Sequence, residues 1–154
     1  MTISGIEAIP FAIPYRKPLR FASGEITAAE HVLVRVHTNT GLVGTAEAPP
    51  RPFTYGETQA SVCAVVDGIF APQIVGMSAL EREAIHGKLN RTGGNPTAKA
   101  AIDMAVWDVI GQALDLSVTE LLGGVSDQER VAHLVRFGAP REMVAAAHPV
   151  RGAC

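Results

Sequence analysis

The chain has 154 residues, 47% hydrophobic and 18% charged, which is enough to bury one sizeable core and is typical of a globular protein. Its thirteen Lys and Arg are scattered among fifteen Asp and Glu, so the net charge of −2 excludes the basic surface that nucleic-acid binding requires. No basic leader and no run of about 18 apolar residues occurs, so we expect a cytoplasmic protein without membrane contact.

The first half of the chain predicts a three-stranded antiparallel meander. Residues 3–13 alternate in polarity with a two-residue period, and a proline within them suits an edge strand. Residues 31–37 place Val32, Val34 and Val36 on one face. Turn residues at 38–41 then lead into an apolar segment at 42–48, a pattern typical of a β-hairpin.

Two segments of this half show no clean period and predict loops. Residues 15–27 combine proline, glycine, arginine and phenylalanine. Residues 49–56 combine three prolines with two aromatic residues and an arginine, which predicts a stiff, shaped lip. Because binding residues concentrate on loops, both segments are candidates for function.

The second half predicts helices. Apolar stripes with helical spacing cover residues 57–70, 79–89 and 96–114, and the last of these is the strongest. Three strands followed by three helices predict an α+β fold, in which a helical bundle packs on the sheet.

The segment from Ala98 to Gly124 combines small residues, which let a helix approach a neighbour closely, with apolar bulk. Its spacing resembles the signature of the mandelate-racemase and muconate-lactonizing group of the enolase superfamily, a helix of the form "A..A.D.A.WD..G" followed by an "LLGG" turn. Mild departures occur at Val106, Val109 and Ser117. The signature residues matched here include Asp103, Trp107, Asp108, Gly111, Gly123 and Gly124.

The hairpin extends the resemblance, because Gly41, Gly44 and Glu47 stand where that family's hairpin has them, although Thr45 and Ala46 depart from it. The similarity covers roughly residues 3–140. It implies an enolase-like N-terminal capping domain at 1–124 and, at 125–154, the start of a (β/α)7β barrel, with a first strand at 130–137 and a helix beginning at 140.

In that family, two loops of the cap close the active site at the end of the barrel. The resemblance places these loops at 17–27 and 49–55. The side chains expected to reach a small carboxylate substrate are Arg20, Phe21, Arg51, Phe53 and Tyr55.

The family's chemistry uses Mg²⁺ or Mn²⁺ held by barrel carboxylates, and paired lysines as acid and base. The three lysines of this chain, Lys17, Lys88 and Lys99, lie in the cap and form no K-x-K pair. We therefore expect no catalytic residue, metal ligand or cofactor in this chain. We also expect a reading frame truncated or shifted near residue 147.

Several polar residues have simpler interpretations. His31 and His37 lie on the polar face of a strand and are expected to be solvated or locally hydrogen-bonded. Asp103 and Asp108 are separated by about 140° around a helix, so they cannot share one ion and are expected to be structural. Glu47, beside the proline-rich segment, is expected to orient that loop.

The resemblance favours part of a metal-dependent isomerase, with muconate cycloisomerase as the preferred parent. We expect the chain to be inactive alone and to form homo-oligomers. Dipeptide epimerase and o-succinylbenzoate synthase share the same scaffold and stay open. A different class, a non-catalytic stand-alone module for binding or oligomerisation, is the alternative.

Overall fold

The computed structural model describes residues 1–21, 24–126, 128 and 138–147. These residues form two compact units. The first contains Met1–Ala12 and Glu30–Gly123, and the second contains Ile13–Ala29 together with what is described of the chain after Gly123.

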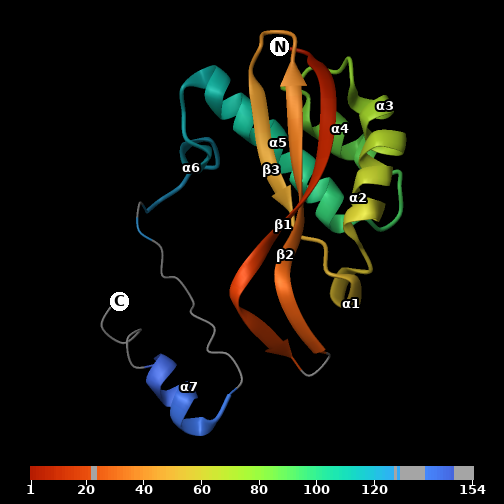
Figure 1. The fold of residues 1–154 in the computed structure, drawn as a ribbon. Coiled ribbons are helices and arrows are strands. Elements are labelled where there is room, and N and C mark those ends of the chain that lie inside the picture. The colour runs from red at the N-terminus through yellow and green to blue at the C-terminus, as the bar shows by residue number, and fades with distance from the viewer. Residues whose placement is uncertain (22–23, 127, 129–137, 148–154) are drawn as a thin grey trace. The chain divides into compact units, whose positions relative to one another are not determined.

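Three strands form one antiparallel sheet in the order β1-β2-β3, as the sequence predicts (Figure 1). They are β1 (Ile3–Phe21), β2 (Gly24–Thr38) and β3 (Val43–Ala48). In the β2–β3 pair, Val32 lies opposite Ala48 and Val36 opposite Gly44. This register turns the valines of β2 into the core and leaves the residues between them on the other face.

The prediction of a loop at 15–27 is wrong, because the described residues of this segment continue β1 and β2. The proline and glycine residues of this segment suggested irregular structure, but both residue types are compatible with the positions they occupy in β1 and β2. β1 is an edge strand, where a missing N–H breaks no central ladder, and Gly24 at the start of β2 adopts a φ of 139°, which favours glycine.

The helix α5 (Pro96–Leu114) crosses one face of the sheet in the first unit (Figure 1). Its predicted bounds are confirmed. Ala98, Ala101 and Ala105 are buried along it, and their small side chains allow close packing against the sheet. At Gly44 of β3, an added Cβ would lie 1.9 Å from the carbonyl oxygen of Ala105.

The other helices complete the α+β fold. A π-helical turn at Val66–Phe70, labelled η1, precedes Pro72, which has no N–H to continue a regular α-helix. In addition to α5, the described helices are α1 (Pro52–Tyr55), α2 (Gln59–Val65), α3 (Ala71–Ile74), α4 (Arg82–Leu89), α6 (Val118–Leu121) and α7 (Pro140–Ala147).

The helix predicted to start at residue 140 is confirmed as α7, whereas the strand predicted at 130–137 lies outside the described residues. Within the described ranges, no helix has the length and apolar character needed to cross a bilayer.

Candidate capping-loop site

The segment from Pro49 to Gly56, which we call the proline loop, connects β3 to α2 in the first unit. The middle of this segment is a single helical turn, α1, which covers residues 52–55 and has Pro52 at its first position. This turn displays Phe53, 90% exposed, and Tyr55, 53% exposed. Two aromatic side chains on a stiff turn can cover an apolar ligand surface.

The far end of the proline loop is fixed by Gly56 and Glu57. Gly56 ends α1 with a φ of 74°, a left-handed conformation that favours glycine. Glu57 is only 3% exposed, and its carboxylate accepts hydrogen bonds from the backbone N–H groups of Thr97 (3.0 Å) and Ala98 (3.3 Å). The N-terminal end of α5 therefore anchors the loop.

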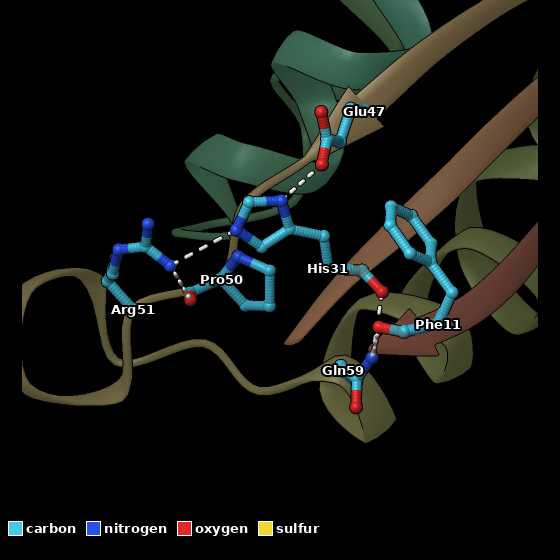
Figure 2. Close-up of polar contacts among 6 residues, drawn as sticks. All are labelled: Phe11, His31, Glu47, Pro50, Arg51 and Gln59. Atoms are coloured by element: carbon cyan, nitrogen blue, oxygen red, sulfur yellow. Dashed lines mark hydrogen bonds and ion pairs between the residues drawn. The ribbon is translucent and has the colours of Figure 1, made fainter. Parts of the chain in front are cut away.

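The near end is fixed by a contact of three side chains, Glu47, His31 and Arg51, which we call the relay (Figure 2). Glu47 Oε1 makes a short hydrogen bond with His31 Nδ1. The other ring nitrogen, Nε2, lies 3.3 Å from Arg51 Nη1. The same Nη1 donates to the carbonyl oxygen of Pro50 at 3.3 Å. This geometry supports the expectation that Glu47 orients the loop, with His31 as the intermediate.

The β2–β3 register explains how these residues meet. Leu33 pairs with Glu47, so His31, two residues earlier on β2, is a diagonal neighbour of Glu47 on the same face. Arg51 follows β3 by three residues. The sequence signal that could have identified His31 is this diagonal relation to Glu47, which can be read from the sequence once the register of the hairpin is known.

The backbone of His31 is also fixed. The side-chain amide of Gln59, at the start of α2, donates to the carbonyl oxygens of both Phe11 and His31 at 2.7 Å (Figure 2). The Phe11 ring meets the imidazole edge-on, with centroids 6.1 Å apart, and the His31 side chain is only 14% exposed. Sequence patterning gave no indication of Gln59, because its partners are 48 and 28 residues away.

Arg20 and Phe21 lie at the end of β1, in the second unit. Arg20 Nε forms an exposed ion pair with Glu25 Oε2 at 2.9 Å, and Phe21 is 51% exposed. Of the five predicted substrate contacts, Arg51, Phe53 and Tyr55 therefore come together on the proline loop of the first unit, and Arg20 and Phe21 belong to the second unit.

The two aspartates of the signature helix hold elements together. Asp103 Oδ1 accepts from Arg82 Nη2 at 2.8 Å, and the Arg82 guanidinium lies 3.7 Å from the centre of the Trp107 ring, joining α4 to α5. Asp108 Oδ2 accepts from the backbone N–H of Thr45 at 2.7 Å and from Gln112 Nε2 at 3.1 Å. Both contacts agree with a structural role.

The signature glycines serve the turn after α5. A Cβ at Gly111 would lie 2.8 Å from the carbonyl oxygen of Leu116, so α5 and the following segment require glycine there. Gly123, the last residue of the first unit, has a φ of 73°, a left-handed conformation that favours glycine, and Gly124 begins the part of the chain that belongs to the second unit. Asp108, Gly111 and Gln112 also line an open hollow of about 320 Å³ at this end of α5.

The described part of the chain contains no set of side chains that could hold a metal ion. There, no three His, Cys, Asp or Glu side chains come together in a way that could hold an ion. Hard divalent cations need several oxygen ligands, and the carboxylates of the site are already bonded to His31 or to backbone N–H groups. The described residues can position and cover a ligand.

Comparison with known proteins shows consistent similarity. Residues 6–123 match the N-terminal domain of the mandelate racemase / muconate lactonizing enzyme family. The L-Ala-D/L-Glu epimerase of Bacillus subtilis is 34% identical over 146 residues, which are 94% of this chain and 40% of that protein. The chain thus spans about 40% of the length of this curated relative.

Two solved structures are similar over almost the whole chain. The muconate lactonizing enzyme of Mycobacterium smegmatis, complexed with muconolactone, is 61% identical with a TM-score of 0.95 over 99% of this chain and 42% of that one. A dipeptide epimerase of Enterococcus faecalis, complexed with Mg and a dipeptide, is 31% identical with a TM-score of 0.91 over 96% of this chain and 42% of that one.

Proposed function

Because the chain belongs to the mandelate racemase / muconate lactonizing enzyme family and matches its N-terminal domain, we propose that it is the substrate-capping part of a muconate cycloisomerase-like isomerase. The ligand is a small carboxylate. The reaction of the whole enzyme is a lactonization, or the related removal of a proton α to a carboxylate.

The observation that carries this proposal is the proline loop itself. One arginine and two exposed aromatic residues are held on a turn whose two ends are bonded to the sheet and to α5. A guanidinium matches the planar geometry of a carboxylate, and aromatic side chains exclude water from the bound carbon skeleton. The 61% identity to a muconate lactonizing enzyme favours a dicarboxylate as the ligand.

The division of labour follows from the residues described. Arg51 binds and orients a carboxylate, while Phe53 and Tyr55 cover it. The described residues offer no ligand set for the family's divalent cation, so we propose that its ligands lie in the part of the whole enzyme beyond this chain. We propose a domain boundary at Gly124 and no turnover by this chain alone.

Dipeptide epimerisation is the second candidate, favoured by the 34% identity to the L-Ala-D/L-Glu epimerase. A dipeptide also carries a carboxylate that Arg51 could bind, but it is zwitterionic and differs from a dicarboxylate at its other end. The two candidates therefore differ in what lies beyond the Arg51 contact.

A chimaera tests the proposal. Residues 1–124 replace the equivalent segment of the M. smegmatis enzyme, and both lactonization of cis,cis-muconate and epimerisation of L-Ala-D-Glu are assayed with Mg²⁺ or Mn²⁺. We expect lactonization, and a rise in KM of roughly tenfold or more when Arg51→Met removes a charge-assisted hydrogen bond.

Arg91→Met, on the segment after α4, is the matched control and should leave KM unchanged. A folded chimaera that only epimerises dipeptides would favour the second candidate. One that does neither, or turnover by the 154-residue chain alone, would contradict the proposal.

A further inference from the structure

We propose that Glu47 and His31 are positioning residues for Arg51. Glu47 fixes one tautomer of the imidazole, and that tautomer presents an acceptor which fixes the guanidinium at the base of the proline loop. This inference rests on the proposed function, in which Arg51 binds a carboxylate, but the experiment that tests it needs no substrate.

The first step is the assignment of the proton. An arginine guanidinium carries only donors, so the 3.3 Å contact between Arg51 Nη1 and His31 Nε2 requires Nε2 to accept. The proton of a neutral imidazole then lies on Nδ1, where the Glu47 carboxylate accepts it. Either change of this pattern, a proton on Nε2 or a doubly protonated ring, would turn a donor toward Arg51.

The second step concerns Arg51. Its Nη1 carries two hydrogens, and the structure gives each an acceptor, His31 Nε2 and the carbonyl oxygen of Pro50. Within the described part of the chain, Nε and Nη2 make no hydrogen bond. One edge of the guanidinium is therefore fixed by the protein, and the other donors stay available for a carboxylate.

The third step is the rigidity of the imidazole. Gln59 holds the His31 carbonyl, the Phe11 ring meets its edge, and Glu47 bonds its Nδ1. A long arginine side chain loses considerable rotamer freedom when it binds a ligand. Fixing it beforehand reduces that cost, which is the advantage of preorganisation.

The same strand offers a matched histidine–glutamate pair. His37 Nε2 lies 3.0 Å from Glu7 Oε2, and Arg35 also bonds Glu7, so the arginine there contacts the carboxylate and not the ring. Glu7→Gln consequently changes a histidine–carboxylate pair without touching the relay, which makes it the control for Glu47→Gln.

The test is nitrogen NMR of the complete 154-residue chain labelled with ¹⁵N. For the wild type we expect His31 Nδ1 to resonate as a protonated nitrogen and Nε2 as an unprotonated one. The two Nη nitrogens of Arg51 should give separate signals, because the bonds to His31 and Pro50 slow rotation of the guanidinium. Glu47→Gln, whose amide can donate to Nδ1, should remove the Nδ1–H pattern and merge the Nη signals.

Two substitutions of His31 separate positioning from general structure. In His31→Gln the terminal oxygen occupies the place of Nε2, so it can still accept from Arg51, and the separate Nη signals should persist. In His31→Asn the amide occupies the place of Nδ1 and reaches only Glu47, so the Nη signals should merge. A general structural role would affect both variants alike.

The proposal is overturned if wild-type His31 carries its proton on Nε2, a measurement that depends on no variant folding. Unchanged Arg51 signals in folded Glu47→Gln and His31→Asn would also overturn it. So would an equal effect of Glu7→Gln on Arg51. Failure of the chimaera to lactonize muconate would leave these NMR outcomes as they are, so the two proposals fail separately.

Discussion

At the scale of single residues, Gly44 shows how closely β3 lies against α5. A Cβ added there would lie 1.9 Å from the Ala105 carbonyl oxygen and 2.9 Å from the Val109 nitrogen, and both are backbone atoms that cannot rotate away. We expect Gly44→Ala to lower the free energy of unfolding by roughly 3 kcal/mol, measured by urea denaturation.

Gly87 provides the comparison. It lies inside α4 with nothing within 4 Å of an added Cβ, so Gly87→Ala should stabilise the chain by up to about 1 kcal/mol. Equal effects at the two glycines would contradict the close packing of β3 on α5.

The relay marks the limit of what single residues reveal in the sequence. Glu47 could be predicted to orient the proline loop, because it ends a strand directly before it. The hairpin register could have paired His31 with Glu47, but it could not show that His31 is only 14% exposed or that the Phe11 ring and the Gln59 amide contact it. Those two contacts depend on tertiary packing, which periodicity does not encode.

At the scale of elements, α5 depends on a carboxylate from outside the helix. Asn95 precedes it without a side-chain cap, and Glu57 supplies the acceptors for the first N–H groups. We expect Glu57→Gln to cost about 1–2 kcal/mol in urea unfolding, because a buried charge-assisted bond is lost beside the helix dipole.

The same substitution at Glu83, exposed in the first turn of α4, should change the free energy of unfolding by only a few tenths of a kcal/mol. Similar costs at Glu57 and Glu83 would mean that burial and the bonds to Thr97 and Ala98 contribute nothing.

The helix α6 begins with a capping box between Ser117 and Glu120, whose contribution to stability depends on pH. Hydrogen bonds from the Ser117 backbone and then from its hydroxyl lower the pKa of Glu120 below its ordinary value. A lowered folded-state pKa means that the cap stabilises α6 above the unfolded pKa and loses this contribution as pH falls through the folded one.

We expect carboxyl ¹³C NMR to show Glu120 titrating below the range of an ordinary glutamate. Ser117→Ala should return its pKa part of the way, since the hydroxyl is the second of the two causes. A titration of Glu120 that Ser117→Ala leaves unchanged would show that the hydroxyl does not contribute.

Elements with a strong local period could be predicted accurately, and those determined by pairing could not. The helix at 96–114 has the predicted bounds, because apolar side chains repeat along nineteen residues. Residues 15–21 and 24–27 appeared irregular, since they belong to the paired strands β1 and β2 but have no alternating buried face. The turn α1 was likewise missed, because four residues are too few to show a helical period.

At the scale of the whole molecule, the described core belongs to the first unit. All of its buried apolar residues fall between Ile3 and Ile110, and none lies within 13–29. Ending the chain at Gly124 should therefore leave the urea midpoint of unfolding unchanged. A clearly lower midpoint, with the loss of cooperativity, would place stabilising contacts beyond the proposed boundary.

The Gln59 amide has a consequence for how this architecture can diversify. This amide bonds the backbone of Phe11 on β1 and of His31 on β2, each two residues from the nearest residue of the second unit, Ile13 or Ala29. Because Gln59 holds both strands on the first-unit side of those two points, changes between them should leave the β2–β3 register, and with it His31 and Arg51, in place. We therefore expect the segment between Ile13 and Ala29 to tolerate exchange while the hydrogen bonds of His31 and Arg51 stay the same.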